Sequence, residues 1–314
     1  MRDQQTDGAD SARALTEVDH LVRFLRSDWM GLTLCCWLRD GLPKNPNQSS
    51  SAFTPFSVTP PIRLAVLLDT PPVAPGNPRS QWSPTHLSPN LQRCVSGVRV
   101  HRGHVEQSSD AARAAVGTST GLHIWEVKWE GQQRGSHALL GVSTHKSPLQ
   151  ASGYKALIGG DSCSWGWELS TNQLWHDGKE GRSYPGGGAT GVLSVPDCVL
   201  LVVDADAGTL GYVVDDCYLG VAFQDLPKGV ELFPAVSCVW GGAEICIRYL
   251  SGTTRDAPAL QALSRLSARR ALRLHGTQNH THSLPSALQR LLLDTHTHHR
   301  DTPEHAQTQM LLVT

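Results

Sequence analysis

Between about residue 64 and residue 249, short apolar runs alternate with clusters of glycine, asparagine, aspartate and proline. Residues 199–203 form a continuous apolar run, residues 204–208 carry a turn signal, and residues 209–214 are apolar again. A second turn signal at Asp215 and Asp216 leads to a further apolar run. Apolar runs of this length, separated by turn residues, are typical of antiparallel hairpins. The pattern predicts a mainly β fold, namely an antiparallel β-sandwich.

The segment from residue 121 to residue 129 shows the alternation most clearly. Strict alternation places every second side chain on one face of a strand. The four residues on the expected core face are His123, Trp125, Val127 and Trp129. The opposite face carries Leu122, Ile124, Glu126 and Lys128.

Aromatic residues mark three strand-like segments and fall into two groups. An indole ring buries a large apolar area, so we expect Trp125, Trp129, Trp165 and Trp167 to fill the core. Trp240 and Tyr154 instead adjoin glycine in turn-like sequence. Rings in such settings project from loops and can anchor a partner.

The spacing of apolar residues changes after residue 249. Leucines at 260, 263, 266 and 274 lie among alanine and arginine with no internal glycine or proline, and Pro258 suits a first helical turn. We therefore expect an amphipathic helix at 258–274 and a second short helix at 285–293.

Residue composition also divides the chain into regions. We expect a flexible N-terminal extension at 1–61, which includes a helix near 15–38, followed by the β domain at 62–252. A helical region at 257–294 and a disordered tail at 295–314 complete the division.

Charge and cysteine content restrict the partners. A net charge of −1 gives no long-range attraction to nucleic acid or to an anionic membrane. Eight scattered cysteines without a C-x-x-C pair suit a reduced intracellular protein. The apolar stretch at 29–38 is too short to cross a bilayer, and acidic residues precede it. We expect a cytoplasmic protein that binds neither nucleic acid nor membranes.

Candidate metal and catalytic sites are weak. Asp204, Asp206 and Asp215 are spaced as in a calcium loop, but Gly208 and Thr209 occupy positions that need a ligand and a glycine, so a turn is favoured. The C-terminal histidines lack a partnering cysteine pattern. We therefore expect no metal and no cofactor.

No protease or hydrolase signature accompanies the histidines inside the β domain. His137 and His176 would act as general bases only with a nucleophile in reach. A structural role is favoured for both, and no residue is assigned as catalytic.

A series of motifs then recurs in order: RGSHALLGVS at 134–143, SWGW at 164–167, HDGK at 176–179, LLVVD at 200–204, GTL at 208–210, YLGVAF at 218–223 and VWG at 239–241. Over about residues 64–292, the chain resembles the SPRY domain-containing SOCS box proteins. The resemblance implies a SPRY-type bent antiparallel β-sandwich that presents loops to a short peptide, followed by a short α-helical SOCS box. It also implies that this SOCS box recruits elongin B, elongin C and a cullin scaffold of the cullin-5 type in a ubiquitin ligase.

The resemblance also implies a pocket for peptides of the type Asp-Ile/Leu-Asn-Asn-Asn. The matching positions are Arg102, Gly135, Ser136, Tyr154, Leu157, Val239, Trp240 and Gly241. An arginine can pair with the peptide's aspartate through two hydrogen bonds. Where the family has Arg-x-Pro-x-Ala, this chain has Arg102, His104 and Glu106. Glu106 could repel an acidic peptide or divert Arg102 into an internal ion pair.

The tail matches the SOCS box in part. The family's elongin-binding helix has a leucine, a cysteine four residues later and an aliphatic residue four further on. Here these positions are Leu260, Ser264 and Ala268. The cullin-contacting Leu-Pro-Leu-Pro pattern keeps its second half, Leu284 and Pro285.

Two functions follow. The first is a non-catalytic substrate-recognition adaptor of an elongin–cullin ubiquitin ligase that promotes proteasomal degradation. The second is a SPRY peptide-binding scaffold whose divergent tail recruits no ligase.

Overall fold

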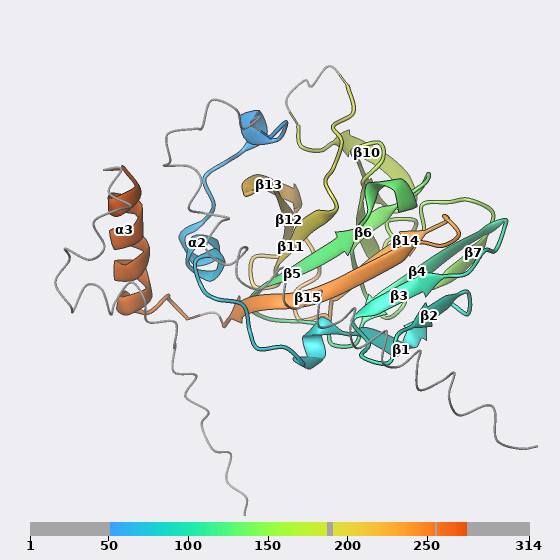
Figure 1. Cartoon of the computed structure of the whole chain (residues 1–314), viewed down its shortest axis with the longest axis horizontal. Coiled ribbons are helices and arrows are strands. Elements are labelled where there is room, and N and C mark those ends of the chain that lie inside the picture. Colours follow the sequence, from blue (N-terminus) through green and yellow to red (C-terminus); the bar gives the residue numbers. More distant parts are fainter. Residues whose placement is uncertain (1–50, 187–190, 255, 275–314) are drawn as a thin grey trace, which may run out of the picture.

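The computed structural model describes residues 51–186, 191–254 and 256–274, and its main body is two antiparallel sheets packed face to face (Figure 1). The first sheet has the strand order β1-β4-β14-β6-β8-β9-β10, with β7 paired to β4. Its strands are β1 Trp82–Leu87, β4 Ser108–Ala114, β6 Leu139–Ser143, β7 Gln150–Ser152, β8 Ser164–Glu168, β9 Gln173–His176, β10 Lys179–Ser183 and β14 Phe233–Cys238.

The second sheet has the order β13-β12-β11-β5-β15-β3-β2. Its strands are β2 Leu91–Arg93, β3 Arg99–Arg102, β5 Leu122–Trp129, β11 Cys198–Asp204, β12 Thr209–Val214, β13 Cys217–Phe223 and β15 Glu244–Thr253. The predicted mainly β fold is therefore confirmed.

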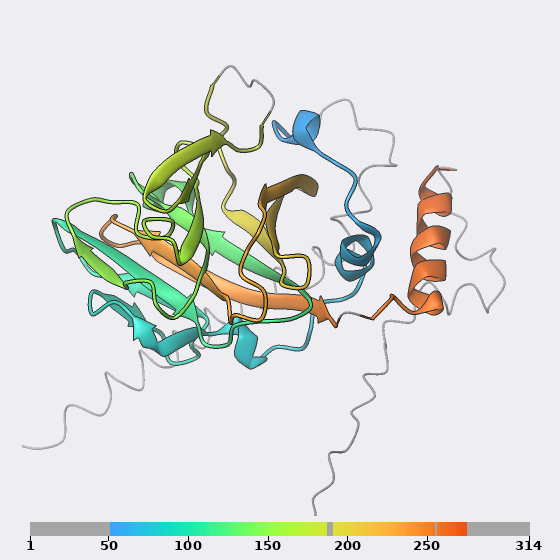
Figure 2. The same cartoon turned by 180° about the vertical axis from the view of Figure 1, so that it is seen from behind.

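In the described part of the chain, helices lie in the connections between strands, over the outer face of the second sheet and after β15. The short 3-10 helices are η2 Thr54–Phe56, η3 Pro78–Ser80 and η4 Gly131–Gln133. The α-helices are α2 Ile62–Leu68 and α3 Leu260–Leu274, and the latter confirms the helix predicted after residue 258. In both views α2 lies between the sandwich and α3 (Figures 1 and 2).

Turn chemistry sets the hairpins of the second sheet. The two residues between β12 and β13, Asp215 and Asp216, have φ angles of 46° and 66°. Positive φ at both central residues is the signature of the type I′ turn, whose twist matches that of paired strands. Gly208, with a φ of 71°, ends the turn between β11 and β12. Both predicted hairpins are therefore present.

The core between the sheets is rich in indole rings. Trp125, Trp129 and Trp167 are at most 1% exposed and Trp165 is 6% exposed, as predicted for the core set. Trp82 joins them, and its indole nitrogen donates to the Ile245 carbonyl at 3.0 Å. Each buried indole therefore contributes a large apolar area to one contiguous core.

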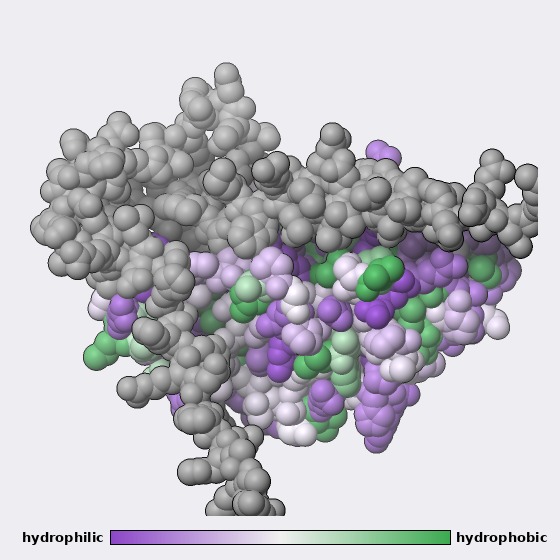
Figure 3. Space-filling model, turned by 60° about the horizontal axis from the view of Figure 1, so that its bottom comes forward, coloured by the Kyte–Doolittle hydropathy of each residue, from purple (hydrophilic) through white to green (hydrophobic). Residues whose placement is uncertain are grey.

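The outer face of β5 is also covered, which the alternation alone does not predict. Leu122 and Ile124, on the face opposite Trp125, are buried with Leu64 and Leu67 of α2. Helix α2 therefore gives the second sheet a smaller apolar layer on its outer side. On the face shown in Figure 3, by contrast, hydrophobic residues form small separate patches among hydrophilic ones.

The folded domain includes residues 51–61, which the sequence assigns to a flexible extension. Phe53 is 1% exposed and belongs to the main core, and the Val58 amide donates to the Tyr218 carbonyl of the edge strand β13 at 2.8 Å. An aromatic side chain with a place in the core fixes this segment, so residues 51–61 are part of the folded domain. The helices predicted at 15–38 and 285–293 and the tail at 295–314 lie outside the described residues.

Candidate functional site

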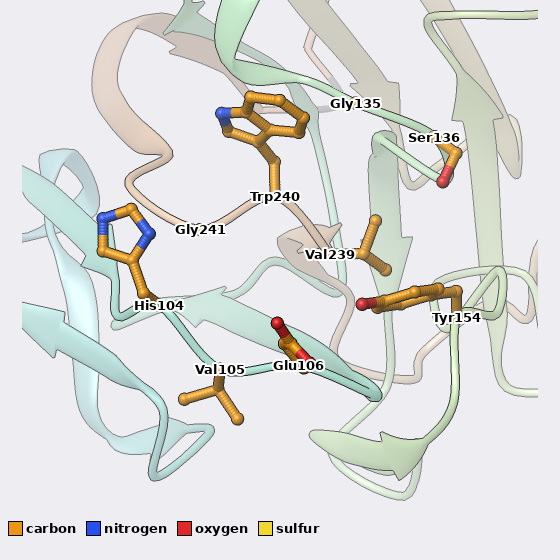
Figure 4. Close-up of a pocket in the computed structure, with 9 residues that line it drawn as sticks. All are labelled: His104, Val105, Glu106, Gly135, Ser136, Tyr154, Val239, Trp240 and Gly241. Carbon is orange, nitrogen blue, oxygen red and sulfur yellow. The ribbon is translucent and has the colours of Figure 1, made fainter.

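Loops at one end of the sandwich enclose a cavity of about 380 Å³ (Figure 4). Four connections supply its walls: the β3–β4 loop, the η4–β6 segment, the residues after β7, and the β14–β15 loop. The lining residues are His104, Val105, Glu106, Gly135, Ser136, Tyr154, Val239, Trp240 and Gly241. We call this cavity the loop-end cleft.

Six of the eight residues predicted for the pocket line this cleft. They are Gly135, Ser136, Tyr154, Val239, Trp240 and Gly241. Tyr154 and Trp240 are 45% and 49% exposed, unlike the buried tryptophans of the core. The predicted division between packing and exposed aromatic residues is therefore confirmed.

Two glycines let the Trp240 loop approach its neighbours. A Cβ on Gly135, whose φ is 60°, would lie 3.0 Å from Cε3 of Trp240. A Cβ on Gly241 would lie 2.7 Å from Nδ1 of His104. Because a side chain at either position would crowd a lining residue, the cleft requires glycine there.

Hydrogen bonds join the separate loops of the cleft. The Gln107 amide donates to Oη of Tyr154 at 3.3 Å. The Gly242 amide donates to the Arg102 carbonyl, and the Arg102 amide to the Ala243 carbonyl, both at 2.9 Å. These bonds fix the β14–β15 loop against the end of β3.

The structure corrects the prediction that Arg102 contacts a ligand. Its side chain is fully buried, and Nε donates to Oδ2 of Asp110 at 2.8 Å. Nη2 donates to the carbonyls of Val105 and Ser108, both at 2.9 Å. Arg102 therefore shapes the β3–β4 loop from beneath, and its ion-pair partner is Asp110 and not Glu106.

Leu157 also lies outside the cleft. It is 5% exposed and packs with Leu139, Ile158 and Ala235 on the outer face of the first sheet. The family resemblance implied that Leu157 contacts the peptide, but its side chain lies in this apolar cluster instead.

The sequence prediction omitted Val105 and treated His104 and Glu106 only as departures from the family pattern. All three line the cleft. The signal that could have found them is their position in the connection between β3 and β4, next to Arg102.

The predicted elongin-binding residues lie on α3. Leu260 is 82% exposed and Ser264 is exposed, whereas Ala268 is half-buried. Leu266 is buried, and Nη1 of Arg269 donates to the carbonyl and to Oδ2 of Asp69, at 3.1 and 2.7 Å, at the end of α2. Helical spacing places Leu260 and Ser264 on the side opposite this packed face. Leu284 and Pro285 lie outside the described residues.

His176, one of the two histidines weighed for catalysis, has structural contacts. Nδ1 of His176 contacts the Ser164 carbonyl at 2.8 Å, and the ring stacks on Trp165. Burial raises the pKa of the Cys238 thiol, next to the cleft, to about 12, so this thiol stays protonated near neutral pH. Within 51–186, 191–254 and 256–274, no group of three His, Cys, Asp or Glu side chains is placed to hold a metal ion.

Asp204 and Asp206, the first two residues of the calcium-like spacing, pair with an arginine of the same chain. Both carboxylates form ion pairs with Arg63 of α2, at 3.7 and 3.1 Å. The turn interpretation therefore holds. None of the helices in the described part of the chain is long and apolar enough to cross a membrane.

A bent sandwich with a loop-built cleft at one end defines a SPRY-type binding domain, and the SPRY domain family matches residues 122–250. The chain is 41% identical over 260 residues to SPRY domain-containing SOCS box protein 2 of Rattus norvegicus, which covers 80% of this chain and 97% of the relative. It is 42% identical over 239 residues to SPRY domain-containing SOCS box protein 1 of Homo sapiens, covering 74% and 87%. Protein gustavus of Drosophila melanogaster is 37% identical over 255 residues, covering 76% and 89%. The chain therefore belongs to the SPRY domain-containing SOCS box proteins and is a SPRY-based adaptor of that family.

Proposed function

We propose that this chain is the substrate-recognition subunit of an elongin–cullin ubiquitin ligase. The SPRY domain binds a short linear peptide of a target protein in the loop-end cleft. The SOCS box, at 257–294, binds elongin B and elongin C and a cullin of the cullin-5 type, so that the target is ubiquitinated and degraded by the proteasome in the cytoplasm. The observation that carries the proposal is the convergence of six predicted pocket residues on one cleft.

The composition of the cleft suits an extended peptide. Tyr154 and Trp240 offer rigid ring surfaces that lose little conformational entropy on binding. Gly135 and Gly241 expose backbone groups beside them, which a peptide chain can reach. Targets with a segment like Asp-Ile/Leu-Asn-Asn-Asn are the family's expectation for such a cleft.

The tail offers a separate contact surface. An 82%-exposed Leu260 leaves most of its apolar side chain available to a partner. Ser264, one turn further along, shares its face of α3. We assign Leu260, Ser264 and Ala268 to elongin C, and Leu284 and Pro285 to the cullin.

The two surfaces lie at opposite ends of one strand. The cleft residues Val239–Gly241 directly precede β15, and α3 follows it, so that the strand runs from the cleft toward the tail (Figure 1). Its ten residues span roughly 33 Å at about 3.3 Å per residue. A target in the cleft would therefore leave the elongin surface unobstructed.

Gel filtration of the full chain with elongin B and elongin C tests the tail assignment. We expect wild type to co-elute with the elongins and Leu260→Asp to elute alone. Arg270→Asp is the matched control, because Arg270 is also exposed but lies on the other side of the helix from Ser264 and Ala268, about 120° and 160° away. Co-elution that survives Leu260→Asp would refute the assignment.

The residues on the elongin face favour a second candidate function. Ser264 and Ala268 are smaller or more polar than the cysteine and aliphatic residue of the family pattern, which reduces the apolar contact. A SPRY scaffold that recruits no ligase would bind peptide in a Trp240-dependent way, yet fail to co-elute with elongins.

A further inference from the structure

The charge of the loop-end cleft comes from a single carboxylate. Its nine lining residues include Glu106 and the imidazole of His104, but no lysine or arginine. Arg102 lies beneath the same loop, but its guanidinium is fully buried and paired with Asp110. The buried arginine is already neutralised, so it leaves the negative charge of Glu106 uncompensated at the cleft.

Within the described residues, the Glu106 carboxylate has no hydrogen bond and no ion pair, and the residue is exposed. Figure 4 shows its side chain directed into the space bounded by Trp240, Val239 and Tyr154. A ligand that covers this carboxylate without supplying a positive group would remove it from water at a cost. An acidic ligand would add like-charge repulsion.

The aromatic rings next to Glu106 also favour a positively charged ligand. Tyr154 and Trp240 are each about half exposed, so part of each ring is accessible from the cleft. Aromatic faces attract lysine and arginine head groups, with tryptophan the most effective. Val239, between them in the lining, offers an apolar contact for the methylene stem of such a side chain.

We propose that the cleft selects peptides that carry a lysine or arginine side chain, whose charged head lies beside Glu106 against the two rings. The inference rests on the proposed function, in that the cleft must bind peptides at all. It changes the expected target class, because an acidic residue at this position of the peptide is rejected by Glu106.

A displayed library of random pentapeptides, selected on the immobilised full chain and sequenced, tests the inference. We expect wild type to enrich lysine or arginine over aspartate about tenfold at one peptide position. Glu106→Gln should reduce that preference to about twofold, and Glu106→Lys should invert it toward aspartate. Glu180→Gln is the matched control: it removes one exposed carboxylate from β10, at the far edge of the first sheet, and should leave the preference unchanged.

The variant Trp240→Ala distinguishes a failure of peptide binding from a failure of the charge preference alone. If wild type retains no more peptide than Trp240→Ala, both the proposed peptide binding and this inference are refuted. If wild type retains peptides in a Trp240-dependent way, but prefers acidic residues or has the same preference as Glu106→Gln, only the inference fails. A Glu106-dependent preference for basic residues supports both.

Discussion

Replacing Arg102 with methionine should lower the stability of the domain and should not remove a contact with the ligand. Methionine keeps most of the apolar stem but removes the guanidinium, which donates to Asp110 and to the carbonyls of Val105 and Ser108. Both side chains of the ion pair are fully buried. The variant therefore leaves a carboxylate in the interior without its cation.

The magnitude follows from what remains around Asp110. Its Oδ1 still accepts hydrogen bonds from Ser88, Ser108 and Asn90, at 2.6, 3.1 and 3.0 Å, so the charge keeps neutral partners. Breaking a buried ion pair by removing one member costs about 3–5 kcal/mol. For a domain of this size, each kcal/mol lowers the melting temperature by about 2–4 °C, so the expected decrease is roughly 6–20 °C.

Urea denaturation followed by tryptophan fluorescence measures the loss of free energy, and thermal denaturation measures the decrease in melting temperature. Arg99→Met is the control on the same strand, because Arg99 pairs with Glu244 at 3.1 Å with both side chains more than a third exposed. Such a pair contributes about 0–1 kcal/mol. The double variant Arg102→Met/Asp110→Asn should be more stable than Arg102→Met alone, since it removes the isolated charge. If Arg102→Met were as stable as Arg99→Met yet lost peptide binding, Arg102 would be a ligand contact and the reasoning would be refuted.

Three further outcomes are expected. Gly135→Ala should cost about 1–2 kcal/mol of stability, because a Cβ is unfavourable at its φ of 60°. It should also displace Trp240 and so weaken peptide binding, which isothermal titration calorimetry measures. Arg269→Ala should weaken the packing of α3 on α2, because it removes an ion pair with Asp69 that is mostly shielded from solvent. If the helix contact loses about 1 kcal/mol of stability, amide hydrogen exchange over 262–270 should be roughly fivefold faster. Burial lowers the pKa of His123, so below about pH 6.5 the unfolded chain binds a proton that the folded chain resists. Stability should therefore fall as the pH falls below that value, and His123→Gln should flatten this part of the curve in urea titrations at pH 5 to 7.

Each of these outcomes has its own control and its own refutation. Gly76→Ala also places alanine at a positive φ, 90°, but with open space around the Cβ, so it should lower stability and leave peptide binding intact. Exchange in β5 should not change in Arg269→Ala; if it rises with that of α3, the ion pair stabilises more than the helix contact. An equal pH dependence in wild type and His123→Gln would show that the His123 imidazole contributes nothing to it.

The sandwich was predictable because its signals are local. Alternation in β5, the apolar run of β11 and the turn residues Asp215 and Asp216 each specify a short structure without reference to the rest of the chain. The covering of Leu122 and Ile124 by α2 was not predictable in this way. It depends on a contact between segments more than fifty residues apart, and alternation does not reveal whether the second face of a strand meets water or a helix.

In the candidate site too, the residues with local signals were predicted correctly, and a residue whose position depends on a contact with another strand was not. Tyr154 and Trp240 were found because an aromatic residue beside glycine in turn-like sequence is a sign of an exposed loop. Arg102 was misplaced because a motif gives the position of a side chain in the sequence but not its direction. Asp110, eight residues further on and on the neighbouring sheet, supplies a buried carboxylate that draws the guanidinium inward at 2.8 Å.

The position of Arg102 bears on how the cleft can differ between members of the family. The arginine holds the backbone of the β3–β4 loop through the carbonyls of Val105 and Ser108, while the side chains at 104 and 106 project into the cleft. A loop whose course is fixed from beneath can exchange these side chains without changing the walls formed by Tyr154 and Trp240. Proline and alanine in the family pattern leave the cleft uncharged at these positions, whereas His104 and Glu106 add polar groups to the same backbone. Selectivity for the charge of a peptide can therefore change here while the stability of the domain and the aromatic surfaces proposed to bind the peptide are preserved.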